Sequence, residues 1–151
     1  MEIPTYEEKL LHQKLKSGNI KEVNSFIRKN TEGDNTYKFQ SCISNRLLHV
    51  RIKRKELLLW ADIPQSFGYK LLTKEKNTNK RDYILRICIV LRMTLDEIQE
   101  ALDAYPMPRL NHLIDRDTII IVGIKFETSL DTINEWLDDY GYGALDKPKN
   151  V

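Results

Sequence analysis

The chain has few cysteines and none of the sequence patterns that mark the common enzyme classes. Its two cysteines, Cys42 and Cys88, form no CxxC pair, and its three histidines are scattered, so neither type is spaced like metal ligands. A glycine-rich phosphate loop and a GxSxG nucleophile elbow are both missing. We therefore expect no enzymatic activity, no cofactor and no metal, and two buried free thiols of the kind found in reducing compartments.

Long hydrophobic runs are missing as well. The longest strongly apolar stretch covers residues 119–124, far short of the roughly 20 residues that a membrane-spanning helix needs. The first ten residues, MEIPTYEEKL, contain neither a basic start nor an apolar core, so they predict no signal peptide. These features predict a cytoplasmic protein with no membrane partner.

Acidic and basic side chains nearly balance over the whole chain, but they are unevenly distributed along it. The formal net charge is +2. Residues 46–92 hold 12 Lys and Arg against 4 Asp and Glu, a net of +8, whereas residues 93–151 hold 5 against 12, a net of −7. This asymmetry fits a polyanion-binding module beside an acidic, partner-facing module, and it also fits a solvated surface with randomly placed charges.

The spacing of apolar residues predicts an all-α fold. Thr5 and Glu8 are spaced as a capping box, which predicts a first helix to about Lys16, and Asn19 is placed to begin a second helix. Residues 30–35 are polar and predict a loop. Three further helices are predicted over residues 37–50, 54–61 and 65–74. We expect Trp60 to lie in the core and His49 to be half-buried.

The second half of the chain contains one pattern twice. Residues 81–110 and 116–145 align without a gap at an offset of 35 residues, and 12 of the 30 aligned pairs are identical. Each copy combines an apolar helix, a hydroxyl N-cap (Thr94 or Ser129) and a short amphipathic helix. The repetition predicts two stacked helical hairpins. The residues predicted to be buried are Ile84, Leu85, Ile89, Leu95, Ile98, Leu102, Ile119, Ile120, Ile124, Leu130, Ile133 and Leu137, and Trp136 is expected beside them.

Each copy opens with an Arg-Asp pair, and we assign these pairs a structural role. Asp82 and Asp117 fall in the first turn of a predicted helix, where a negative charge interacts favourably with the helix dipole. The preceding arginines can bridge to neighbouring acids. The run at residues 118–124 is rich in β-branched residues, so strand pairing there would contradict the helical prediction.

The segment RKELLLWADIPQSFGYKLL, residues 54–72, resembles the helix-turn-helix motif of the lambda-repressor and Cro-type regulators. The resemblance extends over residues 46–102. Four apolar residues fall where that family places its buried contacts, namely Leu57, Ala61, Ile63 and Leu71. The resemblance implies a lambda-repressor-like helix-turn-helix bundle over residues 36–105. An N-terminal helical hairpin would precede it over residues 1–30, and the second copy of the duplicated hairpin unit would pack on it over residues 106–151.

Three positions depart from the pattern of that family. Leu58 stands where the family usually has a small residue, because the two helices of the motif touch there. Asp62 stands at the turn position that usually holds glycine with a positive φ, a conformation that aspartate tolerates better than most residues. Gly68 stands where a β-branched core residue is usual, and glycine within a helix costs up to about 1 kcal/mol.

The resemblance implies a DNA-binding transcriptional regulator. Gln65, Ser66 and Tyr69 would face the bases of the major groove, and glutamine can pair bidentately with adenine. The residues that would contact the DNA backbone are Arg54, Lys55, Lys70, Thr73 and Lys74, with Arg51 and Lys53 in the same basic cluster. One such domain reads one half-site, so tight binding of double-stranded DNA would require a homodimer.

The alternative is a helical protein–protein interaction adaptor that uses the same scaffold without binding DNA. The acidic C-terminal unit offers such an adaptor a surface for a protein partner. The two functions require different surfaces. DNA binding needs an exposed, electropositive helix over residues 65–74, whereas an adaptor would bury that helix and expose an apolar patch elsewhere.

Overall fold

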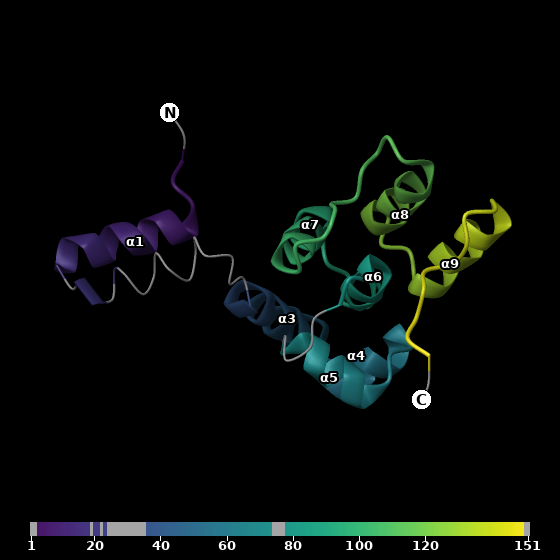
Figure 1. Cartoon of the computed structure of the whole chain (residues 1–151), viewed down its shortest axis with the longest axis horizontal. Coiled ribbons are helices and arrows are strands. Elements are labelled where there is room, and N and C mark those ends of the chain that lie inside the picture. The colour runs from purple at the N-terminus through teal and green to yellow at the C-terminus, as the bar shows by residue number, and fades with distance from the viewer. Residues whose placement is uncertain (1–2, 19, 22, 24–35, 74–77, 150–151) are drawn as a thin grey trace. The chain divides into compact units, whose positions relative to one another are not determined.

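Figure 1 shows the computed structural model, which describes residues 3–18, 20–21, 23, 36–73 and 78–149. These residues contain helices and no strand, so the all-α prediction is confirmed for them. None of their helices is both long and apolar enough to cross a membrane. The chain divides into two compact units, residues 1–35 and residues 36–151. The helices are α1 (Tyr6–Ser17), α3 (Thr36–Val50), α4 (Arg54–Ala61), α5 (Gln65–Leu72), α6 (Arg81–Val90), α7 (Leu95–Ala104), α8 (Asp115–Lys125) and α9 (Leu130–Asp139).

The described part of the first unit is built around α1. The Thr5 hydroxyl accepts a bond from the Glu8 amide at 3.1 Å, and the Glu8 carboxylate accepts one from the Thr5 amide at 2.9 Å. Gly18 ends the helix in the left-handed conformation, with φ of 72°. The predicted capping box and helix end are therefore confirmed. The predicted loop at residues 30–35 lies outside the described residues, as does most of the second predicted helix.

The second unit packs α3, α4 and α5 against α6 and α7, and α8 and α9 against the other side of that pair (Figure 1). Side chains from every one of these helices join a single hydrophobic core. The β-rich run at residues 118–124 is helical and lies within α8. Asp115 and Asp117 in the first turn of α8 and Lys125 in its last turn place charges of the favourable sign at both ends of the helix dipole.

Four pairs of successive helices are joined by the same kind of tight turn. In each turn the first or second residue after the first helix adopts a left-handed conformation, with φ between 52° and 60°, although none of the four is glycine. These residues are Arg51, Asp62, Arg92 and Glu127. In each turn the next amide donates to a carbonyl five residues back, as in Ile63 to Leu58 at 2.9 Å and Met93 to Cys88 at 3.1 Å. In three of the four pairs, α4–α5, α6–α7 and α8–α9, the second helix packs back against the first.

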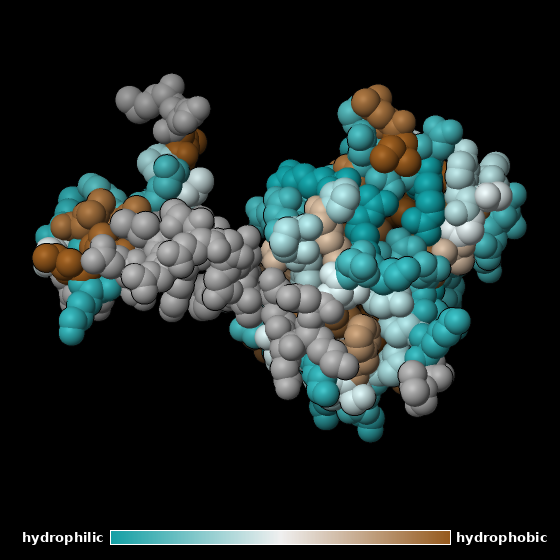
Figure 2. Space-filling view, viewed as in Figure 1, coloured by the Kyte–Doolittle hydropathy of each residue, from teal (hydrophilic) through white to brown (hydrophobic). Residues whose placement is uncertain are grey.

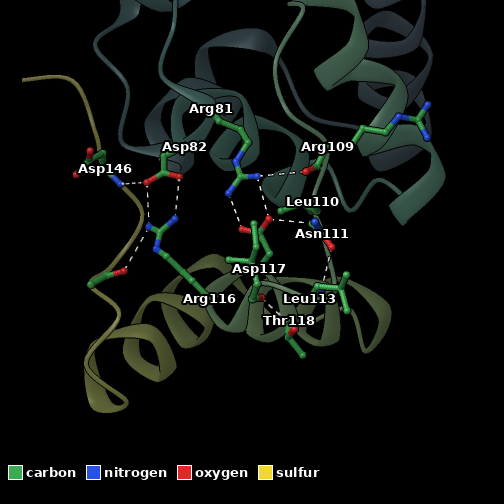
Figure 3. A network of polar contacts seen from close by, with 12 residues as sticks. Arg81, Asp82, Arg109, Leu110, Asn111, Leu113, Arg116, Asp117, Thr118 and Asp146 are labelled. Atoms are coloured by element: carbon green, nitrogen blue, oxygen red, sulfur yellow. Dashed lines mark hydrogen bonds and ion pairs between the residues drawn. The ribbon is translucent and has the colours of Figure 1, made fainter.

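The Arg-Asp pairs that open the two similar segments bridge reciprocally between them (Figure 3). Arg81 at the start of α6 donates two hydrogen bonds to Asp117 on α8, at 2.5 and 3.0 Å. Arg116 on α8 donates two to Asp82 on α6, at 3.0 and 3.2 Å. Asp117 is buried and Asp82 is half-buried. The prediction that these arginines bridge to neighbouring acids is therefore confirmed.

Other hydrogen bonds also recur at the offset of 35 residues. Asp117 accepts a bond from the Asn111 amide and Asp82 one from the Asp146 amide, both at 2.9 Å. Gln99 on α7 accepts from the Leu110 amide, and the equivalent Asn134 on α9 accepts from the Leu145 amide. The helix caps also correspond, because Thr94 and Ser129 each accept from the amide three residues on. The two segments thus share backbone turns and polar contacts as well as sequence.

Most of the predicted core is buried, and six side chains are more exposed than we expected. Trp60 is 54% exposed because it lies at the edge of the apolar face of α4, whose residues Leu57, Leu58 and Ala61 are buried. His49 is exposed, since it falls about 120° round α3 from the buried Ile43 and about 160° from the buried Leu47. The predictions for these two residues were wrong. Leu95, Ile119 and Trp136 are half-buried, whereas the other predicted core residues of the two segments are buried. Cys42, predicted to be a buried thiol, is also half-buried, because it lies beside the buried Ile43 at the margin of the apolar face of α3.

Candidate nucleic-acid interface

The turn between α4 and α5 fixes how the two helices cross. Asp62 has φ of 57° and ψ of 48°, so it occupies the left-handed conformation that glycine adopts most easily. The Ile63 amide then bonds to the Leu58 carbonyl at 2.9 Å, and the Ile63 side chain is buried. Pro64 begins α5 with φ of −55°, close to the value that its ring imposes. The predicted buried contacts of this pair, Leu57, Ala61, Ile63 and Leu71, are all buried.

Leu58 and Gly68 meet where α4 and α5 cross. A methyl group built onto Gly68 would lie only 2.7 Å from Leu58 Cδ1, closer than real side chains approach. The space of the missing side chain is filled by Leu58, which is 1% exposed. A small residue on α5 therefore accommodates a large residue on α4.

A buried arginine ties the end of α4 to the C-terminal segment. Arg86 on α6 donates to the carbonyls of Ala61, Leu145 and Asp146 at 3.2, 2.6 and 2.8 Å. Burial lowers the pKa of Arg86, and the carboxylate of Asp62 opposes that shift. These bonds satisfy the carbonyl at the end of α4 with a charged donor and tie it to the segment after α9.

Basic side chains surround the junction of α3 and α4. Arg51 follows α3, Lys53 precedes α4, and Arg54 and Lys55 form the first residues of α4; all four are exposed. The Arg54 guanidinium donates to the Ser44 hydroxyl at 3.1 Å, which orients it across the end of α3. We call these four residues the basic corner.

A shallow open groove of about 710 Å³ joins the basic corner to α5. Its lining includes Arg51, Lys53 and Arg54 on one side and Tyr69 of α5 on the other. Among the described residues, no acidic side chain lines it. The remaining lining residues are Ser44, Leu47, Leu48 and Ile52. The groove can therefore accept a polyanion along a cationic edge that ends at α5.

The exposed side of α5 carries most of the residues predicted to contact DNA. Gln65 and Ser66 in its first turn are exposed, as is Thr73 at its C-cap, whereas Tyr69 and Lys70 are half-buried. The Gln65 amide donates to the Tyr69 hydroxyl at 3.3 Å, so these two polar groups form one unit on the helix surface. Residue 74, the predicted lysine contact, lies outside the described residues.

Three groove residues were not singled out from the sequence, namely Ser44, Leu48 and Ile52. All three precede residues 54–72, the segment that resembles the helix-turn-helix motif, and they enter the groove because α3 ends just before α4. Nothing in their sequence context marks them. Leu48 is 78% exposed.

Comparisons with known proteins give no family assignment, because no family model, curated protein or solved structure matches the chain. No group of three or more metal-ligating side chains lies together among the residues that the structure describes.

Proposed function

We propose that this protein is a DNA-binding transcriptional regulator of helix-turn-helix type, with α5 as its recognition helix. The observation that carries the proposal is the groove between the basic corner and Tyr69, because it is lined by three basic side chains and reaches the exposed face of α5. DNA offers a regular row of phosphates that such an edge attracts without regard to sequence. A lambda-repressor-like bundle over residues 36–105, with the second copy of the hairpin unit packed on it over residues 106–151, is part of the same proposal.

The exposed residues divide by the chemistry that each can offer to DNA. Gln65 and Ser66 stand at the N-terminal end of α5, the part of a recognition helix that reaches base edges. Gln65 can donate to and accept from adenine, and its bond to Tyr69 holds the amide in one orientation. Arg54 and Lys55 open α4, where they can meet phosphates and fix the position of the protein on the duplex.

The first experiment distinguishes phosphate contacts made by the basic corner from an effect of the net charge of the protein. The triple variant Arg51→Ala, Lys53→Ala, Arg54→Ala should weaken binding to a mixed-sequence duplex at low salt by about tenfold or more, since each lost phosphate contact removes counterion release. A matched control, Lys9→Ala, Lys16→Ala, Lys149→Ala, removes the same charge from exposed positions elsewhere. Equal losses in the two variants would show that net charge, and not the basic corner, attracts DNA.

The second experiment tests base reading by α5. The variant Gln65→Ala should change which duplexes are enriched from a random library, with a loss of about 1–3 kcal/mol at the preferred base. The variant Lys55→Ala should weaken all sequences alike. An unchanged preference for Gln65→Ala would remove α5 from the recognition surface.

A protein adaptor built on the same scaffold is the second candidate. It is favoured by the exposed apolar side chains beside the basic corner, Leu48, Leu59 and Trp60, which are 78%, 74% and 54% exposed. Surface patches of this kind mark protein-binding sites when they are contiguous. If the full chain fails to bind duplex DNA at low salt, the adaptor becomes the better explanation of the same scaffold.

A further inference from the structure

The outer face of the last hairpin exposes apolar and aromatic side chains whose counterparts in the preceding hairpin are buried. At the offset of 35 residues, Ile87 is fully buried but Val122 is 44% exposed, and Leu91 is fully buried but Phe126 is 79% exposed. The same contrast holds at the end of the second helix, where Tyr105 is 5% exposed and Tyr140 is 72% exposed. A shallow groove of about 270 Å³ runs along this face, lined by Thr118, Ile119, Val122, Trp136 and Tyr140.

The preceding hairpin shows what covers such a face. In that hairpin α6 packs against α4, and α7 packs against α3. Tyr105 contacts the Phe39 ring edge-on at a centroid distance of 4.8 Å, and its hydroxyl donates to the Leu71 carbonyl of α5. Helices thus cover this face of α6 and α7. Among them, α4 and α5 are joined by the same left-handed turn that joins α6 and α7.

The outer face of α8 and α9 carries opposite charges at its two ends. Lys125 ends α8, and Asp139 ends α9, which runs back toward the start of α8. Hydrogen bonds from Arg116 to the carbonyls of Gly143 and Ala144 show that the start of α8 lies beside the end of α9. Asp139 corresponds to the buried Ala104, which places it on the outer face, and both charged residues are exposed.

Figure 2 shows a further apolar surface on this unit, over the connection that leads into α8. Leu113 and Ile114 in that connection are 79% and 49% exposed. Aromatic and aliphatic residues exposed together on one side of a hairpin are characteristic of the centre of a protein interface.

We propose that a second copy of this chain covers the outer face of α8 and α9, giving a two-fold dimer of the last hairpins. A hairpin of the same kind already covers the equivalent face within the chain, and another α8–α9 hairpin offers an identical, self-complementary apolar surface. The two-fold axis runs across the helices, because that arrangement brings Lys125 of one copy to the Asp139 end of the other, whereas an axis along the helices would join like charges. The proposal does not depend on DNA binding.

The test is the mass of the full chain in solution, measured by sedimentation equilibrium up to concentrations on the order of 100 micromolar. The wild-type chain should be a dimer. The variant Phe126→Ser, Tyr140→Ser should raise the dimer dissociation constant by about a hundredfold, because it removes two exposed aromatic side chains from the proposed interface. Both side chains are exposed, so the variant should fold, which its circular dichroism would verify. The matched control, Leu48→Ser, Leu59→Ser, removes equally exposed apolar groups outside this face and should remain dimeric.

Charge reversal tests the orientation of the two copies. The single variants Lys125→Glu and Asp139→Lys should each weaken the dimer by about tenfold, since each places like charges together. The double variant restores opposite charges at both ends and should recover the wild-type dissociation constant. A monomeric wild-type chain would overturn the proposal, as would a dimer that tolerates Phe126→Ser, Tyr140→Ser. A double variant weaker than either single variant would overturn the two-fold arrangement.

Discussion

Leu58 fills the space that a side chain at residue 68 would occupy, so the two helices of the proposed motif cross on a leucine and a glycine. Each residue alone departs from the pattern of the lambda-repressor and Cro-type motif, which places the small residue on the first helix. Here the large side chain is on the first helix and the small residue is on the second, so the contact between the helices remains filled. In the last hairpin the order is the usual one, because Gly123 on α8 lies against Ile133 on α9, where an added methyl group would lie 2.6 Å from Cγ1.

A double-mutant cycle should reveal this exchange. Gly68→Ala should destabilise the protein by about 1–3 kcal/mol through overpacking, although alanine favours helix more than glycine. Leu58→Ala alone should cost about 2–5 kcal/mol by leaving a cavity. The double variant should lose less than the sum of the two, because the alanine methyl at residue 68 enters space that Leu58 vacates. Urea unfolding followed by circular dichroism measures all four proteins, and additive losses would contradict the contact.

The reciprocal ion pairs should differ in their contribution from a pair on the surface. Asp117→Ala should cost about 3–5 kcal/mol, because it leaves Arg81 and the Asn111 amide without their shared, buried acceptor. Asp103→Ala should cost under about 1 kcal/mol, since its partner Arg109 is solvent-exposed. The same unfolding experiment compares them. Similar losses for both variants would show that the bridge between α6 and α8 is no stronger than a surface pair.

The two thiols should react at different rates in the folded protein. Burial raises the pKa of both Cys88 and Cys42, so each is a thiol and not the reactive thiolate at neutral pH. Cys88 is fully buried, whereas Cys42 is half-buried. Iodoacetamide should therefore label Cys42 slowly and Cys88 only after unfolding in denaturant, as peptide mass spectrometry can follow. Labelling of Cys88 first, in the native protein, would place it outside the core.

Tyr105 should make the protein less stable in alkali. Burial raises its pKa in the folded state, while an unfolded tyrosine ionises near pH 10, at about its ordinary pKa. The contribution of neutral, buried Tyr105 to the free energy of unfolding is therefore complete below about pH 10 and is lost as the pH rises beyond that value. The urea midpoint of Tyr105→Phe should fall less between about pH 9 and 11 than that of the wild type, since phenylalanine does not ionise. Parallel pH profiles would contradict a buried, neutral Tyr105.

The periodicity of apolar residues was enough to predict most helices of this chain. The ends of α4 were predicted exactly as observed, because charged residues and the Asp-Ile-Pro turn bracket a short apolar run. Helix α8 was predicted correctly although its residues are β-rich, since the helical reading of the similar segment in α6 applied to it. Trp60 and His49 were predicted wrongly because both lie at the margin of an apolar stripe, where sequence alone does not fix which side chains the neighbouring helix covers.

The candidate site was predicted in part. The resemblance to the helix-turn-helix motif predicted which residues of α5 and of the start of α4 would contact DNA. The groove itself did not follow, because Ser44 and Leu48 belong to a preceding helix whose packing depends on Arg46 bonding to the carbonyls at the end of α6. The sequence predicted that Arg81 can bridge to a neighbouring acid, but it did not identify that acid as Asp117. Its reciprocal form requires the relative orientation of two hairpins, which no local pattern specifies.

The salt dependence of duplex binding tests the proposed function most directly. The full chain is titrated into a fluorescent mixed-sequence duplex at several salt concentrations between about 50 and 200 mM, and the logarithm of the association constant is plotted against that of the salt concentration. If the basic corner and Lys70 contact phosphates, the slope should be about −4.5, and Arg51→Ala, Lys53→Ala, Arg54→Ala should flatten it by about 2.7. No binding at about 50 mM salt with tens of micromolar protein, or a slope near zero, would contradict DNA binding by this protein.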